Sequence, residues 1–207
     1  MKRSLKLLAI AALGFMASPS VQAADPYIQP SAVTVIGATG DFGTLSAGAA
    51  AAWDAGTLAD QYTVYDGLFV QEGQQWNHDT WWWDQDPSVN PDPVETTITF
   101  DQPYKISQFI VQADDNDVYK LQYLDGVGSW QDAWTIPTAG GWGMITRDSG
   151  LLAPIVTDQL KFVAVSGDNL YAVSEIQAFG VPVPEPETYA LMLAGLGILG
   201  LVSRRRV

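Results

Sequence analysis

Three consecutive tryptophans, Trp81-Trp82-Trp83, are the residues of this chain best suited to binding a ligand, and His78-Asp79 lie just before them. Neighbouring residues of an extended strand point to opposite sides, so three tryptophans in a row cannot all face one core. We therefore expect at least one of the three to be exposed, or to cover a loop. An exposed indole beside Asp and His offers a flat apolar face for a pyranose ring and polar groups for its hydroxyls.

Two alternatives stay open for this cluster. Two indoles can pack inward while the third covers a rim, and His78 can be an ordinary surface histidine. For Trp76, Trp130 and Trp134 we expect packing positions or the edges of a sheet.

The composition excludes most catalytic chemistry. The chain has 207 residues with no Cys and one His, which rules out disulfide frameworks, zinc ribbons, thiol nucleophiles and any mechanism with two imidazoles. It contains no Gly-x-Ser-x-Gly elbow, P-loop or His-Glu-x-x-His motif. Carboxylate pairs that could serve a glycosidase are present, but among 23 acidic residues such pairs carry little information. The sequence favours a protein that is not an enzyme, with a carbohydrate hydrolase as the less favoured alternative.

Charge is distributed unevenly along the chain. Six of the ten basic residues lie at the two ends, whereas all 23 acidic residues lie between Asp25 and Glu187. The central part thus holds 4 basic against 23 acidic residues, a net charge of −19. Such a body repels phosphate backbones, so we expect no nucleic-acid partner, and divalent cations suit it better.

The N-terminal residues 1–23 have the three parts of a secretory signal peptide. A basic start precedes an apolar stretch over residues 7–17, and Val21-Gln22-Ala23 offers a small-residue cleavage site. The basic residues of that start are Lys2, Arg3 and Lys6.

The C-terminal 25 residues, 183–207, also have three parts. Pro184-Glu185-Pro186 precedes an uncharged apolar stretch over residues 189–202, and Arg204-Arg205-Arg206 follows it. Fourteen residues make about 21 Å of helix, short of a hydrocarbon core of about 30 Å. The order of the parts nevertheless predicts a transmembrane helix with its basic end in the cytoplasm.

This order resembles the PEP-CTERM sorting signal of Gram-negative bacteria. The resemblance implies export through the inner membrane, a membrane-tethered precursor and processing by an exosortase near the Pro-Glu-Pro. The mature form would then lie at the cell surface or outside the cell, in bacteria that make exopolysaccharide and biofilm matrix. The resemblance indicates a route rather than an activity.

Residues 24–182 have the pattern of one all-β domain. Short segments rich in Val, Ile, Thr, Tyr and Phe alternate with turn clusters such as Asp125-Gly126-Val127-Gly128, which predicts an antiparallel sandwich or barrel. Residues 43–55 fit a short helix or a small-residue loop equally well. The expected strands lie at residues 31–36, 95–100, 106–113, 118–124, 134–136, 159–165 and 171–179.

The order of motifs over residues 61–180 is similar to that of discoidin-type domains. The motifs are Tyr65-Asp66-Gly67, the tryptophan-rich stretch, residues 97–106 and 159–168, and a closing Ser174-Glu175-Ile176 with Gly180. The resemblance implies a galactose-binding-domain-like jelly roll, a β-sandwich also found as carbohydrate-binding modules. The Arg-rich strand and the terminal cysteines of that family are missing here.

Modules of that kind often hold a structural calcium between an early Asp-Gly loop and the Glu of the last strand. By the resemblance, Asp66 and Glu175 would be its carboxylate ligands, with nearby carbonyls such as that of Ser174 completing the shell. Alternatively, Asp66 only shapes a turn and Glu175 faces solvent. The acidic cluster 114–117 is a second possible cation site, but it lacks the spacing of an EF-hand and better fits a solvated turn.

Together these features predict a secreted or cell-surface protein, sorted by an exosortase, that binds polysaccharide or glycan of the envelope or matrix through Trp81, Trp82, Trp83, His78 and Asp79. The alternative is a purely structural surface or matrix protein cross-linked by calcium.

Overall fold

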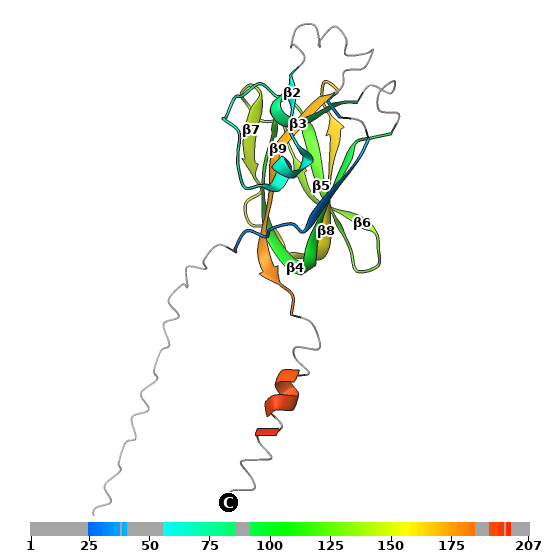
Figure 1. Cartoon of the computed structure of the whole chain (residues 1–207), viewed down its shortest axis with the longest axis vertical. Helices are drawn as coiled ribbons and strands as arrows, with labels where there is room; N and C mark the ends of the chain where they lie inside the picture. Colours follow the sequence, from blue (N-terminus) through cyan, green and yellow to red (C-terminus); the bar gives the residue numbers. More distant parts are fainter. Residues whose placement is uncertain are drawn as a thin grey trace, which may run out of the picture.

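The strands are hydrogen-bonded in one continuous path that folds into two sheets packed face to face, antiparallel apart from one short parallel pair, as the computed structural model shows (Figure 1). The structure describes residues 25–37, 39–40, 56–85, 92–184, 191–196 and 198–199. Within these residues the elements are β1 (Ala32–Ile36), β2 (Thr57–Leu58), the 3₁₀ helix η1 (Gln61–Tyr65), β3 (His78–Asp84), β4 (Glu95–Asp114), β5 (Val118–Leu124), β6 (Trp130–Ile136), β7 (Met144–Asp148), β8 (Ile155–Ser166) and β9 (Leu170–Pro182).

The long strand β4 belongs to both sheets. Its first half pairs with β1 and β8, and β5 and β6 continue that first sheet. Its second half pairs with β7 and β9, and β3 and β2 continue the second sheet. The prediction of an all-β fold is confirmed. The fold is a β-sandwich because the two halves of β4 belong to different sheets.

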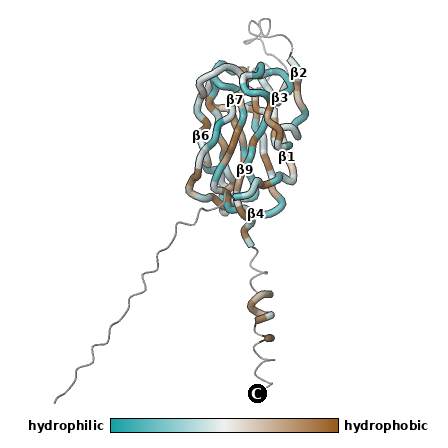
Figure 2. The backbone as a smooth tube through the Cα atoms, turned by 90° about the vertical axis from the view of Figure 1, so that its left-hand side faces the viewer, coloured by the Kyte–Doolittle hydropathy of each residue, from teal (hydrophilic) through white to brown (hydrophobic). Residues whose placement is uncertain are grey.

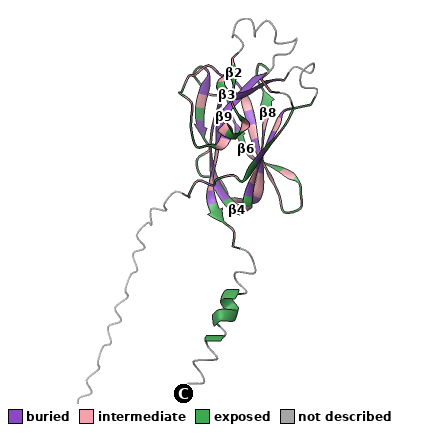
Figure 3. Cartoon of the chain, in the orientation of Figure 1, coloured by how far each residue is buried: buried purple, intermediate pink, exposed green. Residues whose placement is uncertain are grey.

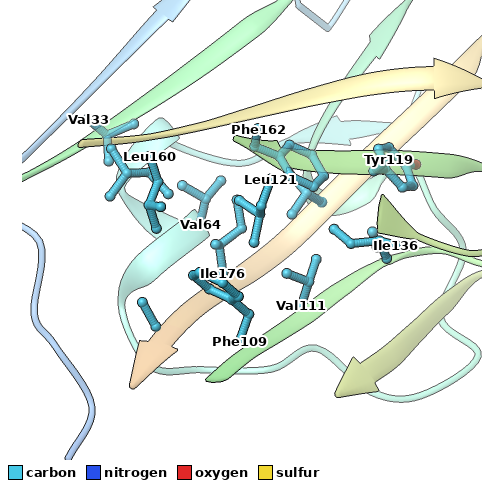
Figure 4. Close-up of a cluster of buried hydrophobic side chains, with 14 of the residues drawn as sticks. Val33, Val64, Phe109, Val111, Tyr119, Leu121, Ile136, Leu160, Phe162 and Ile176 are labelled. Atoms are coloured by element: carbon cyan, nitrogen blue, oxygen red, sulfur yellow. The ribbon is translucent and has the colours of Figure 1, made fainter. Parts of the chain in front are cut away.

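The main core lies between the sheets because each strand alternates inward apolar and outward polar residues. Figure 4 shows side chains from both sheets meeting there, with Leu121 and Phe162 from the first sheet and Val111 and Ile176 from the second. Val64 of η1 is fully buried in the same cluster. Each such side chain contributes about 1.5–3 kcal/mol by leaving water.

A loop of residues 66–77, which we call the covering loop, lies over the outer face of the second sheet. It encloses a second, smaller apolar cluster made by Trp76, Trp82, Met144, Leu170 and Ala172. The loop also buries two polar residues of the second sheet, Gln112 and Glu175. Both are hydrogen-bonded to the backbone of the loop: Gln112 donates to the carbonyl of Val70 at 3.0 Å, and Glu175 accepts from the amide of Gly67 at 3.2 Å. The second sheet therefore has protein on both of its faces.

The segment 25–31 joins the two sheets at the end where the chain leaves the sandwich (Figure 1). Ile28, 3% exposed, donates to the carbonyl of Ala178 in the second sheet, while Ser31 donates to the carbonyl of Thr99 in the first. The amide of Gly180 donates to the carbonyl of Pro26 at 3.1 Å. The first described residues and the last strand thus lie side by side.

The structure describes only part of the transmembrane helix predicted over residues 189–202. Residues 191–196 and 198–199 are helical, apolar and exposed (Figures 2 and 3). No helix in the described ranges has both the length and the hydropathy to cross a membrane, so the transmembrane helix 189–202 stays a prediction. The signal peptide 1–23, residues 43–55, Glu185, Pro186 and Arg204 to Arg206 lie outside the described residues.

Candidate functional site

None of Trp81, Trp82 and Trp83 is exposed; two pack inward and the third lies against a loop, which is the alternative that the sequence left open. Their exposed fractions are 8%, 1% and 1%. Trp81 and Trp83 face the main core, whereas Trp82 faces the cluster under the covering loop and meets Trp76 edge to face at 5.6 Å. The alternation is as predicted, but the covering loop buries the outward residue too. None of the three offers a ring face to a sugar.

Trp142 is a tryptophan that the structure does expose on a loop, at 51%, and Phe69 of the covering loop is exposed as well, at 41%. It lies in the sequence Gly140-Gly141-Trp142-Gly143, between β6 and β7. This loop contacts the covering loop: a Cβ on Gly143 would lie 2.1 Å from the carbonyl oxygen of Gln74. Gly143 also has φ +69°, so a glycine is required there on both grounds.

The acidic cluster 114–117 holds the Trp142 loop in place. Asp115 accepts the amide of Gly143 on its Oδ1 at 2.7 Å, and its carbonyl accepts the amide of Ala139 at 2.8 Å. Asp117 accepts the hydroxyl of Tyr119 at 2.9 Å in the buried interior. The carboxylate of Asp117 is thus engaged inside the protein and that of Asp115 at a partly buried junction between loops, so the cluster is not a wholly solvated turn.

Burial perturbs the carboxyl groups beneath this loop. Desolvation, with some opposition from an amide hydrogen bond, raises the pKa of Asp114 to about 7. Desolvation and the neighbouring Asp114 raise the pKa of Asp117 to about 8. The guanidinium of Arg147 lies nearby but donates to the carbonyls of Ala113 and Asp114.

His78 and Asp79 lie where the covering loop enters β3. Gln74 of the covering loop links His78 to the Trp142 loop. Its carbonyl accepts the amide of Met144, which follows the Trp142 loop, and its side chain donates to the carbonyl of His78. Asp79 is exposed, adopts φ +53° and accepts the hydroxyl of Thr57 at 2.9 Å. His78 and Asp79 therefore stay at the surface although the neighbouring tryptophans do not.

We call the exposed side of these two loops the Trp142 face. It comprises residues 71–75, His78, Asp79 and Trp142, with Asp115 at its edge. Sequence reasoning missed Trp142, although a tryptophan with glycines on both sides is a pattern typical of an exposed turn. Trp76 packs in the smaller cluster, Trp134 packs against the main core, and Trp130 lies on the edge strand β6, as predicted.

The structure brings Asp66 and Glu175 together, as the calcium prediction requires. Glu175 accepts the amide of Gly67, and Asp66 accepts the amide of Leu68 at 2.8 Å. Burial, with a smaller contribution from Asp66, raises the pKa of Glu175 to about 7. In the described parts of the chain no three His, Cys, Asp or Glu side chains gather as a metal-holding group. A calcium ion here would need backbone carbonyls or water for most of its 6–8 oxygens.

Residues 182–206 match the PEP-CTERM protein-sorting motif. The resemblance drawn from Pro184-Glu185-Pro186 and the terminal arginines is therefore confirmed, and the motif marks an exported protein processed by an exosortase. No curated protein matches this chain in sequence.

Solved structures resemble the sandwich at low sequence identity. The C-terminal domain of a chitobiase from Bacteroides fragilis aligns at TM-score 0.50 and 12% identity over 77% of this chain and 100% of that one. The family 32 carbohydrate-binding module of EndoD from Streptococcus pneumoniae aligns at TM-score 0.48 and 15% identity over 75% of this chain and 99% of that one. The corresponding module of NanJ from C. perfringens, solved with galactose, aligns at TM-score 0.48 and 12% identity over 74% of this chain and 97% of that one. Such identities speak for the fold alone, a β-sandwich like the chitobiase domain.

Proposed function

We propose that this chain is an exported glycan-binding protein without catalytic activity, and that the Trp142 face is its binding surface. The observation that carries the proposal is the half-exposed indole of Trp142 on a loop fixed by Asp115 and Gln74. A rigid exposed indole presents an apolar plane to the C–H side of a pyranose at little entropic cost.

The same face offers polar groups for the sugar hydroxyls. The covering loop contributes the exposed Gln71, and the start of β3 contributes the exposed carboxylate of Asp79. The surface is shallow and formed by loops, an arrangement that suits binding better than hydrolysis, which needs a carboxylate pair across a cleft. The sorting motif supports the proposed place of action, a glycan of the envelope or the extracellular matrix.

A calcium ion at the junction of Asp66 and Glu175 is part of the proposal. The two carboxylates supply hard oxygen donors between the covering loop and β9. An ion there would stabilise the start of the loop that carries the binding surface, without touching the glycan.

Affinity electrophoresis against a panel of bacterial polysaccharides tests the binding proposal. We expect at least one polysaccharide to retard the protein, and the substitution Trp142→Ala to abolish the retardation. Trp130→Ala is the matched control, because Trp130 lies on β6 of the other sheet. If no polysaccharide retards the folded protein, or if both variants lose retardation equally, the Trp142 face does not bind glycans, and a structural, calcium-cross-linked role becomes the better account.

A further inference from the structure

The Trp142 face carries negative charge held in fixed positions. Glu72 accepts the amide of Thr146 at 3.1 Å, Asp79 accepts the hydroxyl of Thr57, and Asp115 accepts the amide of Gly143. These bonds orient the three carboxylates, and none of the donors is a cation. The charge of each carboxylate is therefore not neutralised by its protein partner.

The lysine side chains of the sandwich lie elsewhere. Lys120 pairs with Asp132 at 2.6 Å and Lys161 with Glu95 at 3.3 Å, both on the first sheet. Lys105 lies on β4 opposite Val181, toward the end where the chain leaves the sandwich. Within the described residues the face thus has no lysine.

Among the described residues, Arg147 is the cation close to the Trp142 loop, and it is not available to a ligand. It is 8% exposed, and its guanidinium donates to the carbonyls of Ala113, Asp114 and Ile145. It offsets part of the charge of Asp114 and Asp115 from below, but it cannot reach a saccharide carboxylate on the surface.

We infer that the ligand of the Trp142 face is a glycan with free amino groups, that is, a hexosamine polymer that is at least partly de-N-acetylated. This inference rests on the proposed function. A protonated amine is attracted by the carboxylates of the face and, through a cation–π contact, by the π-face of Trp142. A uronate polymer carries a negative charge at every repeat and is repelled by the carboxylates of this face and by a body whose net charge is −19.

The test compares two glucosamine oligosaccharides of equal length, one N-acetylated and one not, by calorimetry on the full chain at a pH where the free amine is protonated. We expect the de-N-acetylated oligosaccharide to bind more tightly. We also expect its affinity to fall as salt rises from about 0.01 M to about 1 M, which shortens the Debye length from about 30 Å to about 3 Å.

Charge-neutral variants separate this face from the general acidity of the protein. Asp115→Asn and Asp79→Asn keep an oxygen acceptor for Gly143 and Thr57, and Asn tolerates the positive φ of Asp79. Each should weaken amine binding about two- to fivefold, the range of one exposed charge pair. Asp132→Asn on the first sheet removes the same charge and should leave binding unchanged.

The outcomes are distinguishable. Equal, salt-independent binding of both oligosaccharides, lost in Trp142→Ala, would keep the proposed function and overturn the inference. An equal loss in Asp132→Asn and Asp115→Asn would attribute the amine effect to bulk charge and also overturn it. Absence of binding to these oligosaccharides and to every other glycan tested would overturn both proposals.

Discussion

The indole of Trp83 is 1% exposed and meets the rings of Tyr119 and Phe162 edge to face, each at 6.5 Å. Trp142 has about half of its surface accessible. The glycines on both sides of Trp142 indicate an exposed turn, whereas the neighbours of Trp83, Trp82 and Asp84, do not reveal that its indole is buried. The difference arises from the strands and loops that pack around them, and it separates tryptophans buried in the fold from one exposed at the surface.

Truncating the two residues should therefore have different effects on stability. Trp83→Ala leaves a large cavity in the main core and should lower the free energy of unfolding by about 3–5 kcal/mol. Trp142→Ala should change it by no more than about 0.5 kcal/mol, because the loop is held by backbone contacts. Urea unfolding followed by circular dichroism measures both. A comparable loss of unfolding free energy in the two variants would contradict the distinction between a buried Trp83 and an exposed Trp142.

Glu175 tests whether calcium stabilises the junction with the covering loop. At a calcium concentration about 100-fold above Kd, binding to the folded state alone adds about 2.7 kcal/mol. We expect thermal unfolding with EDTA and then with added calcium to show a rise in Tm in the native chain and none in Glu175→Gln. Glu95→Gln, on the first sheet, is the control. An identical Tm with EDTA and with calcium in the native chain would exclude the ion.

At the scale of elements, the strands could be predicted from the sequence because alternation and turn clusters are local properties. Residues 118–124, predicted as a strand, coincide with β5, and the predicted strands 95–100 and 106–113 lie within the single long strand β4. The burial of the outward face of β3 could not be predicted from the sequence. It depends on a cluster in which residues of the covering loop and of β3 pack with Leu170 and Met144, which are far away in the chain. The junction of Asp66 with Glu175 was found only because a family resemblance supplied the long-range pairing.

The contact between the Trp142 loop and the covering loop is testable with glycines. In Gly143→Ala the new methyl would collide with the carbonyl of Gln74 at 2.1 Å, and φ is +69°. We expect this variant to displace Trp142 and lose glycan retention. Gly128→Ala has a similar φ of +83° with nothing within 4 Å, so it imposes comparable backbone strain without a collision. Retention in affinity electrophoresis should survive in Gly128→Ala, and equal behaviour of the two variants would contradict the role of the contact.

Considered as a whole molecule, the sandwich places its sorting motif and its proposed binding surface on different parts of the fold. The motif begins at residue 182, where β9 ends and where residues 25–31 also lie. The Trp142 loop lies between β6 and β7, next to the start of β7. Processing at the C-terminal end can therefore proceed without occupying the face proposed to bind glycan.

The buried carboxyl groups make the stability of the whole sandwich depend on pH. The folded-state pKa is about 7 for Asp114 and Glu175 and about 8 for Asp117, whereas unfolded chains have values of about 4. The folded state therefore binds more protons between these limits. Their stabilising contribution is complete below about pH 4 and is lost as the pH rises to about 8.

Urea unfolding at several pH values measures this dependence, and Asp117→Asn isolates one group. The amide keeps an oxygen acceptor for the hydroxyl of Tyr119 but carries no charge at any pH. We expect the variant to lose less stability than the native chain between about pH 4 and pH 8. Charge repulsion within the acidic domain also lowers stability as the pH rises. Asp132→Asn, which removes an exposed carboxylate on β6, measures how much of the change comes from losing one charge. If Asp117→Asn and Asp132→Asn have the same slope, Asp117 is ionised in the folded protein at neutral pH, and the buried cluster does not govern the pH dependence.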